Sequence, residues 1–554
     1  MRDKLLTRNN AVALIFLTAC AAVMAFTGLG SRHAPQSSWA MAREGEAAVA
    51  DAGAVVEVER ISYWVGLGEG SCAIELSRDG AFWERAGLVE QPDVFGYMEW
   101  RVIPTAGAAR YLRLVTLRPG LEIGEVGAFG PDGRQLPLAG IEGPAEAFDE
   151  QAIVVRTPTA LTGMYFDETY FARSAWEQLR GFEPTETTHP PLGRTIISIG
   201  IALWGMNPFG WRFMSALAGT LSIAVLYLLA RRLFGRTSWA LLAGFLFSVD
   251  SRRFAQSRMA TVDVFVLLFT LLAFWFVLEH ARGDRPWPWL LAAGVALGAG
   301  LACKWSAAYP AVGVVVLFLT AEIRKAREAS GREALIAIAG AVGRGLVCLA
   351  AVPLAVYAAA WLPWVIGRGA TAADVVARHA AMYRYHSTIS EARWYASAWW
   401  QWPLDLRPIW LYRGTVDVAA DRVASIVTMG NPATWWLGTL AIPAVASIAA
   451  ARRDRVAAWI LVALLCSWLP WAFAARRLTF IYHFLPATPF LVLGLVRCFE
   501  RLADRFPRTR PAAIAFASVA ALVFALFLPL LTGMPVPRAY VEALRWLNTW
   551  IFSA

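Results

Sequence analysis

Long apolar runs recur along most of this 554-residue chain, and they restrict its possible folds more than any other feature. A helix needs about 20 apolar residues to cross the roughly 30 Å hydrocarbon core of a bilayer, and many runs reach or approach that length. They lie at 11–29, 211–230, 237–254, 260–279, 288–303, 307–323, 335–361, 433–450, 456–473, 480–497 and 511–532. Because 58% of the residues are hydrophobic, the chain is predicted to be a polytopic α-helical membrane protein.

The loops between these runs predict how the helices are oriented. Lys and Arg accumulate in short cytoplasmic loops, and the N-terminus of this chain is basic. Further basic segments lie at 231–236, 281–286, 324–332, 451–455 and 501–510. All fall on one side of the membrane if the amphipathic stretch 192–204 lies in the interface without crossing. The sequence therefore predicts about 11 spans, a cytoplasmic N-terminus and an extracytoplasmic C-terminal tail.

The first apolar run has two possible roles. Its basic start and apolar core are also typical of a signal peptide, and Ser38, Trp39 and Ala40 resemble a cleavage site. The predicted topology works best if the run is retained, so residues 1–30 are interpreted as the first transmembrane helix.

The net charge and the cysteines do not indicate a nucleic-acid-binding protein, a metal site or a disulfide-rich protein. The formal charge of +10 reflects basic cytoplasmic loops, so it does not predict a nucleic-acid partner. The 6 cysteines are scattered without metal-binding spacing, and they predict no disulfide framework.

Residues 50–150 differ from the apolar runs. Short segments of β-forming residues alternate there with turn residues such as Asp79-Gly80 and Asp132-Gly133. This pattern predicts a small β-sandwich on the outer face, inserted after the first helix. Three segments resemble the discoidin, or galactose-binding-like, jelly roll: Ser77–Trp83, Tyr111–Leu114 and Glu125–Gly130. Two roles stay open for this domain, binding of sugar or acceptor and structural docking.

A polar segment at 160–207 carries adjacent carboxylates beside the membrane domain. Asp167 and Glu168 follow an aromatic pair, and His189 precedes two prolines. The carboxylates could simply begin a solvated helix, because acidic side chains are favourable at a helix N-terminus. Ionisable groups at the edge of a membrane domain are costly, however, and they indicate a functional site.

Several cations lie at the predicted outer ends of the spans, where the positive-inside rule does not place them. They are Arg212, Arg252, Arg253, Arg258, Lys304, Arg476 and Arg477, accompanied by Asp263 just inside an apolar run. Each side chain could snorkel to the interface on its own. Together with the carboxylates, they predict a site where cations hold a lipid-phosphate leaving group and a base accepts the proton of a hydroxyl.

The motifs in this part of the chain resemble protein O-mannosyltransferases that use dolichyl- or polyprenyl-phosphate-mannose, within the GT-C glycosyltransferase superfamily. In family order they are Phe166–Glu168, His189–Arg194, Gly210–Phe213, Ser257–Asp263, Cys303–Ser306, Trp402–Trp410 and Arg477–Ala487. They cover about 160–500, nearly all the chain outside the β-domain. The resemblance implies a GT-C fold whose number of spans agrees with the count from the apolar runs.

The resulting organisation has seven parts. They are a first helix at 1–30, a discoidin-like β-sandwich at 50–150, a catalytic extracytoplasmic loop at 160–207, helices at 208–364, an extracytoplasmic loop at 365–430, helices at 431–534 and a tail at 535–554. Two features depart from the family. Tyr170 stands where His usually follows the carboxylate pair, and 365–430 is too short for the β-trefoil of eukaryotic members.

The resemblance implies an inverting transferase that moves a hexose, taken as mannose, from a polyprenyl-phosphate sugar to Ser or Thr hydroxyls of exported proteins. Asp167 would be the general base, and Glu168 would position the base or the acceptor. Arg212, Arg258 and Lys304 would hold the donor phosphate. The other predicted site-lining residues are His189, Asp263, Arg407, Arg477, Tyr482 and His483. No metal or cofactor is expected, because the leaving group is already activated.

The implied partners are a lipid-linked donor and an exported protein or glycan acceptor, in the bacterial inner (plasma) membrane with an extracytoplasmic active site. Transfer to a lipid or cell-wall glycan is the alternative, favoured by Tyr170. A transporter would line a pathway with buried charges, but these charges gather at one face without a clear inverted repeat. A sugar-binding receptor built on the β-domain is a further alternative, and a homo-oligomer is left open. The Trp-rich run 394–402 predicts an interfacial belt, or else a sugar-stacking surface.

Overall fold

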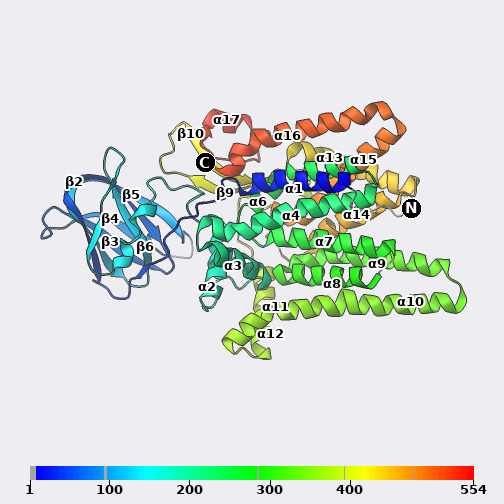
Figure 1. The fold of residues 1–554 in the computed structure, drawn as a ribbon, viewed down its shortest axis with the longest axis horizontal. Helices are drawn as coiled ribbons and strands as arrows, with labels where there is room; N and C mark the ends of the chain where they lie inside the picture. The colour runs from blue at the N-terminus through cyan, green and yellow to red at the C-terminus, as the bar shows by residue number, and fades with distance from the viewer. Residues whose placement is uncertain (1–7, 93–95, 284–285, 392, 477, 554) are drawn as a thin grey trace.

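The computed structural model describes residues 8–92, 96–283, 286–391, 393–476 and 478–553. Figure 1 shows an elongated molecule, with a β-domain at one end and a bundle of long helices along the rest of the long axis. The N-terminal helix starts at the far end of the bundle, whereas the chain ends close to the β-domain side.

The predicted apolar runs coincide with helices. In the described part of the chain, 9 helical segments are long and apolar enough to cross a membrane. They contain α1 (Arg8–Phe26), α4 (Pro208–Phe234), α7 (Asp263–Arg282), α9 (Ala308–Glu328), α10 (Gly331–Leu346) continued by α11 (Val352–Arg368), α13 (Pro432–Ala451), α14 (Arg455–Trp468), α15 (Thr488–Arg505) and α16 (Arg510–Thr532). Two further runs form the shorter α5 (Thr237–Ser248) and α8 (Pro286–Cys303). The polytopic helical fold is confirmed, and the number of spans stays a prediction.

The run at 237–254 is divided by a helix cap and is not one continuous helix. α5 ends at Ser248, and the Asp250 carboxylate accepts a hydrogen bond of 2.8 Å from the backbone amide of Arg253. This cap starts a second short helix, α6 (Ser251–Ser257), which packs closely on α4. A Cβ on Gly219 of α4 would lie 2.2 Å from the Cβ of Ser257, so this contact requires glycine.

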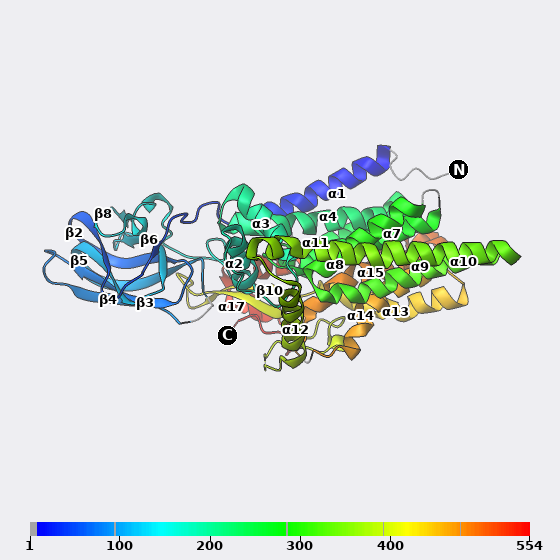
Figure 2. The same ribbon diagram turned by 90° about the horizontal axis from the view of Figure 1, so that it is seen from below.

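The polar segment folds into two short helices at the end of the bundle that faces the β-domain (Figure 2). α2 (Glu168–Leu179) packs on α3 (Leu192–Trp204), which in turn packs on α4. With 13 residues, α3 is about 20 Å long, which is shorter than the hydrocarbon core. Its length is consistent with the predicted interfacial position.

The β-domain is an antiparallel sheet of 8 strands in the order β1-β6-β2-β5-β3-β4, with β7 beside β6 and β8 beside β2. The strands are β1 (Trp39–Ala40), β2 (Ala47–Val65), β3 (Gly70–Ser77), β4 (Glu84–Gln91), β5 (Glu99–Arg118), β6 (Glu122–Phe129), β7 (Gln135–Leu136) and β8 (Ala139–Glu142). Bulges bend the long β2–β5 ladder without ending it, so β2 and β5 continue for 19 and 20 residues. The β-sheet domain is confirmed, while its discoidin-like fold stays a prediction.

The β-domain packs directly against the polar segment. The backbone amide of Met164 donates to the carbonyl of Met98, at 3.0 Å. The guanidinium of Arg173 in α2 lies over the ring of Tyr97, 4.4 Å from its centroid. One buried hydrophobic cluster runs from the β-sheet into α2 and α3 without a break. The position of α2 therefore depends on the β-domain.

The predicted outer loop at 365–430 has regular structure over the same end of the bundle (Figure 2). It contains α12 (Ala372–Thr388) and the hairpin of β9 (Ile409–Gly414) and β10 (Arg422–Thr428). The C-terminal tail pairs β11 (Val536–Pro537) with β10 and continues as α17 (Arg538–Ala543).

Candidate active site

Glu168 and Arg212 form a buried ion pair. Arg212 Nε and Nη2 donate to the two carboxylate oxygens of Glu168 at 2.8 and 2.7 Å, and the side chains are 1% and 0% exposed. The backbone amide of Ala260 also donates to this carboxylate, at 2.9 Å. Arg212 Nη1 donates to the carbonyl of Leu29 at 3.0 Å, and Nη2 also donates to the carbonyl of Gly163 at 2.8 Å. These contacts tie four segments together and leave neither side chain facing a substrate, so they do not support the predicted acceptor and phosphate roles.

Arg258 closes the C-terminal end of α1. Its guanidinium donates to the carbonyls of Met24, Ala25 and Thr27 at 3.1, 2.7 and 2.8 Å, and to that of Gly28. A cation is favourable there because the last carbonyls of a helix lack partners within the helix. The structure thus uses Arg258 to anchor α1, which does not support its predicted contact with the donor phosphate.

Asp167, in contrast, has a carboxylate that no described residue contacts by a hydrogen bond or an ion pair. It is half-buried and lies immediately before α2. Burial raises the pKa of Asp167 to about 7, although the charges of Lys304 and Arg476 act to lower it. Phe166, the preceding residue, has a φ of 52°, in the left-handed region that β-carbon-bearing residues avoid. Such strain is concentrated at functional sites.

Lys304 acts on the Asp167 carboxylate through its charge and is held by Asp263. Its Nζ donates to both Asp263 oxygens, at 2.8 and 3.0 Å, and lies 5.0 Å from the centre of the Tyr482 ring. Asp263 is the first residue of α7, where the helix dipole favours a carboxylate. An ammonium group has three donors, so Lys304 can still bind an anion.

His189 is oriented by a pair of charges from its own loop. Its Nδ1 lies 3.0 Å from Glu186 Oε1, and Arg194 Nη1 donates to the other carboxylate oxygen at 3.2 Å. Burial lowers the pKa of His189, and the nearby Glu186 only partly offsets this. The ring is therefore neutral, with its proton on Nδ1 and a lone pair on Nε2. That Nε2 is buried and has no hydrogen-bond partner among the described residues.

A pocket of about 150 Å³ brings several of these side chains together. It is lined by Lys304, His189 and His483, and also by Arg476 and His386. The rest of its lining includes Trp305, Tyr309, Tyr383 and Trp471. Three predicted site residues therefore share one cavity, and Asp263 and Tyr482 contact Lys304 beside it.

Two further pocket residues, His386 and Arg476, have no individual role in the site that the resemblance implies. Arg476 Nη1 donates to His386 Nδ1 at 3.0 Å, and His386 Nε2 donates to the carbonyl of Thr188 at 2.7 Å. Burial lowers the pKa of His386 to about 3, so this imidazole is neutral and the positive charge stays on Arg476. Arg476 carried a sequence signal as an outer-end cation, whereas His386 on α12 carried none.

The other predicted site residues differ in whether they line the pocket. His483 Nδ1 lies 3.1 Å from the amide nitrogen and 3.0 Å from the carbonyl oxygen of Phe480, and its buried Nε2 has no hydrogen-bond partner among the described residues. Arg407 Nη1 donates to the carbonyl of Trp394 at 3.0 Å and does not line the pocket. Arg477 lies outside the described residues. In the Trp-rich run, Trp402 is buried against His483, with 5.8 Å between the ring centres.

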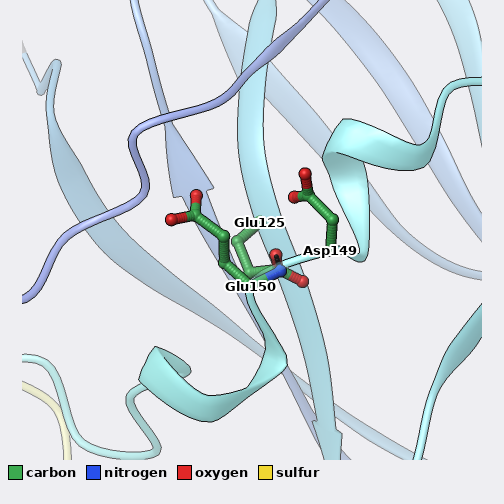
Figure 3. Close-up of side chains that lie close together, drawn as sticks. All are labelled: Glu125, Asp149 and Glu150. Atoms are coloured by element: carbon green, nitrogen blue, oxygen red, sulfur yellow. Dashed lines mark hydrogen bonds between the residues drawn. The ribbon is translucent and has the colours of Figure 1, made fainter.

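A separate acidic group lies in the β-domain. Figure 3 shows Glu125, Asp149 and Glu150 close together, with carboxylate oxygens within 4.8 Å of one another. Glu150 accepts hydrogen bonds from the backbone amides of Gln36 and Ser37, and the Ser37 hydroxyl donates to Asp149 at 3.0 Å. The group therefore attaches the segment after α1 to the β-domain.

Comparisons with known proteins agree with this architecture. Residues 188–359 match the dolichyl-phosphate-mannose-protein mannosyltransferase family, and residues 371–550 match the C-terminal four-transmembrane region of protein O-mannosyltransferases. A polyprenol-phosphate-mannose–protein mannosyltransferase of Mycolicibacterium smegmatis is 27% identical over 467 residues, which cover 71% of this chain and 89% of the relative. The enzyme of the same name from Mycobacterium tuberculosis is 28% identical over 455 residues, or 70% of this chain and 86% of the relative.

A solved structure shares the fold. The chain is similar to a Saccharomyces cerevisiae protein O-mannosyltransferase in a complex bound to the sugar donor, with a TM-score of 0.62 and 14% identity. The similarity covers 70% of this chain and 89% of the other. Since the two family matches together span most of the chain outside the β-domain, and the fold agrees, this chain belongs to the dolichyl-phosphate-mannose-protein mannosyltransferase family of GT-C glycosyltransferases.

Proposed function

We propose that this chain transfers mannose from a polyprenyl monophosphate to Ser or Thr hydroxyls of exported proteins, with inversion at the anomeric carbon. The names of the two mycobacterial relatives support both the donor and the protein acceptor. The observation that carries the mechanism is the carboxylate of Asp167, which makes no hydrogen bond or ion pair with any described residue. The positive charges of Lys304 and Arg476 act on this carboxylate. A base and two cations close together fit a hydroxyl acceptor and a phosphate leaving group.

The proposed reaction has one displacement step. The acceptor oxygen attacks the anomeric carbon and forms the glycosidic bond, while its proton passes to Asp167. The bond from that carbon to the phosphate oxygen breaks, and the polyprenyl phosphate leaves with the electron pair. Lys304 and Arg476 stabilise the charge that grows on the phosphate. No metal or cofactor is assigned to this step.

The two histidines of the pocket fit a sugar with hydroxyl groups. His189 Nε2 is a hydrogen-bond acceptor, and His483 Nε2 donates or accepts according to its tautomer; a sugar hydroxyl can match either role. Both atoms are buried without a partner among the residues described. A buried polar atom without a partner costs free energy, so a ligand that supplies the missing bonds is favoured. Glu186 and Arg194 act as positioning residues for His189.

The pocket is proposed to open on the extracytoplasmic face of the bacterial inner membrane. The connection from α9 to α10, which carries the basic segment 324–332, lies at the end of the bundle away from the β-domain (Figure 1). The positive-inside rule assigns such a connection to the cytoplasm, and the β-domain and pocket then lie outside.

The function is tested by incubating the purified protein with polyprenyl phosphates that carry mannose, glucose or arabinose, together with a Ser- and Thr-containing peptide. We expect consumption of the mannose donor with formation of a mannosylated peptide, and equal rates in the presence of a metal chelator. Transfer to a lipid or glycan acceptor without transfer to any peptide would instead favour the alternative acceptor class.

The rate of transfer is expected to rise with pH through about 7. Burial raises the pKa of Asp167 to about 7, so the protonated acid prevails below that pH and the proton-accepting carboxylate above it. Arg476 lowers this pKa by its charge, so Arg476→Gln should shift the midpoint of the pH–rate profile to higher pH. Arg413→Gln, on the exposed part of β9, is the control without such a shift. A wild-type rate that is constant across neutral pH would argue against Asp167 as the base.

A further inference from the structure

A second pocket lies between α4, α7, α9 and α14, at the end of the bundle opposite the β-domain (Figure 1). Its volume of about 680 Å³ exceeds the 150 Å³ of the pocket at Lys304. Apolar side chains form its walls, among them Leu233, Val277, Leu278, Leu317, Val462 and Trp459. Five arginines line it as well: Arg232, Arg282, Arg324, Arg327 and Arg455.

Most of this positive charge has no carboxylate partner among the described residues. Arg232 is paired with Glu279 at 2.5 Å. Arg282 donates to a backbone carbonyl, that of Arg232, at 3.3 Å, and makes no ion pair within the described ranges. The side chains of Arg324, Arg327 and Arg455 contact no described carboxylate. The pocket therefore combines an apolar interior with four charges that have no counterion in the described chain.

This pocket is separate from the candidate active site. α9 has 21 residues and is about 30 Å long, close to the thickness of the hydrocarbon core. Tyr309 at its start lines the pocket of Lys304, and Arg324 and Arg327 at its end line the second pocket. The two cavities therefore lie in opposite leaflets, so the second one cannot hold the same lipid phosphate as Lys304.

We propose that the second pocket binds one anionic phospholipid of the surrounding membrane. Its phosphate would lie among Arg282, Arg324, Arg327 and Arg455, and an acyl chain would lie along the apolar walls. Guanidinium groups bind phosphate oxygens in pairs, and basic pockets between transmembrane helices recognise anionic headgroups. Arginines that merely followed the positive-inside rule would need no cavity beside them and would show no preference for one lipid.

The proposal is tested by titrating the full-length protein in detergent micelles with a fluorescent phosphatidylglycerol. The variant Arg282→Gln/Arg324→Gln/Arg327→Gln removes three exposed charges from the pocket and should weaken binding about 100-fold. Its matched control, Arg452→Gln/Arg508→Gln/Arg510→Gln, removes three exposed charges that do not line the pocket and should bind like the wild type. An equal loss in both variants, or equal binding of phosphatidylcholine, would overturn the proposal.

A second variant tests whether binding requires the cavity itself and not only the positive charge of this surface. Ala458 lines the cavity and is exposed, so Ala458→Trp should fill the acyl-chain space without disturbing the fold or the arginines. We expect it to weaken phosphatidylglycerol binding as well, and we expect inorganic phosphate not to compete. Wild-type binding by Ala458→Trp, or stronger binding of polyprenyl phosphate than of phosphatidylglycerol at this site, would contradict an anionic phospholipid as the occupant.

Discussion

Asp167→Asn is expected to lower the rate of mannosyl transfer about 100- to 10,000-fold, because the amide cannot accept the proton of the acceptor hydroxyl. The substitution keeps the size of the side chain, and Asn is as favourable as Asp at a helix start, so α2 should be unaffected. The measurement is the initial rate of peptide mannosylation at saturating donor, compared with the wild type in the same detergent.

Measuring donor affinity distinguishes a general-base role of Asp167 from a role in holding the donor phosphate. The proposed phosphate contacts are Lys304 and Arg476, so Asp167→Asn should leave donor affinity nearly unchanged. Asp421→Asn, at an exposed aspartate of the outer loop, is the matched control and should transfer mannose at the wild-type rate. A near-normal rate for Asp167→Asn would exclude the base assignment, whereas lost donor binding would assign the carboxylate to the donor.

The carboxylate pair shows how far the sequence predicts the site. Asp167 and Glu168 are adjacent, and the motif alone assigns both to catalysis. Successive residues of a helix point about 100° apart, so two neighbours at a helix start face different surroundings. Here Glu168 points into the protein toward Arg212, whereas the Asp167 carboxylate has no hydrogen-bond or ion-pair partner among the described residues. The direction of each side chain depends on the packing of α2, which no local pattern specifies.

The cations illustrate the same limit. Arg212, Arg258 and Lys304 look equivalent in the sequence, because each lies at the outer end of an apolar run. In the structure the two arginines bind carbonyls and a carboxylate within the protein, while Lys304 lines the pocket. His386 reaches the same pocket from α12, far along the chain, through packing of the outer loop. Contacts at such sequence separation leave no signal in a single sequence.

The fold was more predictable than the site. Crossing a bilayer requires long apolar runs, so the helices α4, α7 and α16 could be located from composition alone. The sheet of β9, β10 and β11 was not predicted, because Val423 pairs with Val536 from the distant tail. Strand pairing depends on the partner strand more than on the strand itself.

Glu168→Gln is expected to destabilise the protein by about 3–5 kcal/mol, since it leaves the positive charge of Arg212 buried without a counterion. Arg212 is 1% exposed, so water cannot replace the lost carboxylate. The measurement is thermal unfolding in detergent, read separately from the rate of transfer. The double variant Glu168→Gln/Arg212→Met should recover much of the loss, because it removes the buried charge as well.

The two adjacent carboxylates should therefore respond in opposite ways. Asp167→Asn should abolish most activity at unchanged stability, and Glu168→Gln should lower stability while the fraction that stays folded still transfers mannose. Glu168 contacts α4 and the segment before α7, so its loss would loosen the position of Asp167 without removing the base. If Glu168→Gln unfolded like the wild type yet lost its activity, the carboxylate would be catalytic and its pairing with Arg212 would have to open during the reaction.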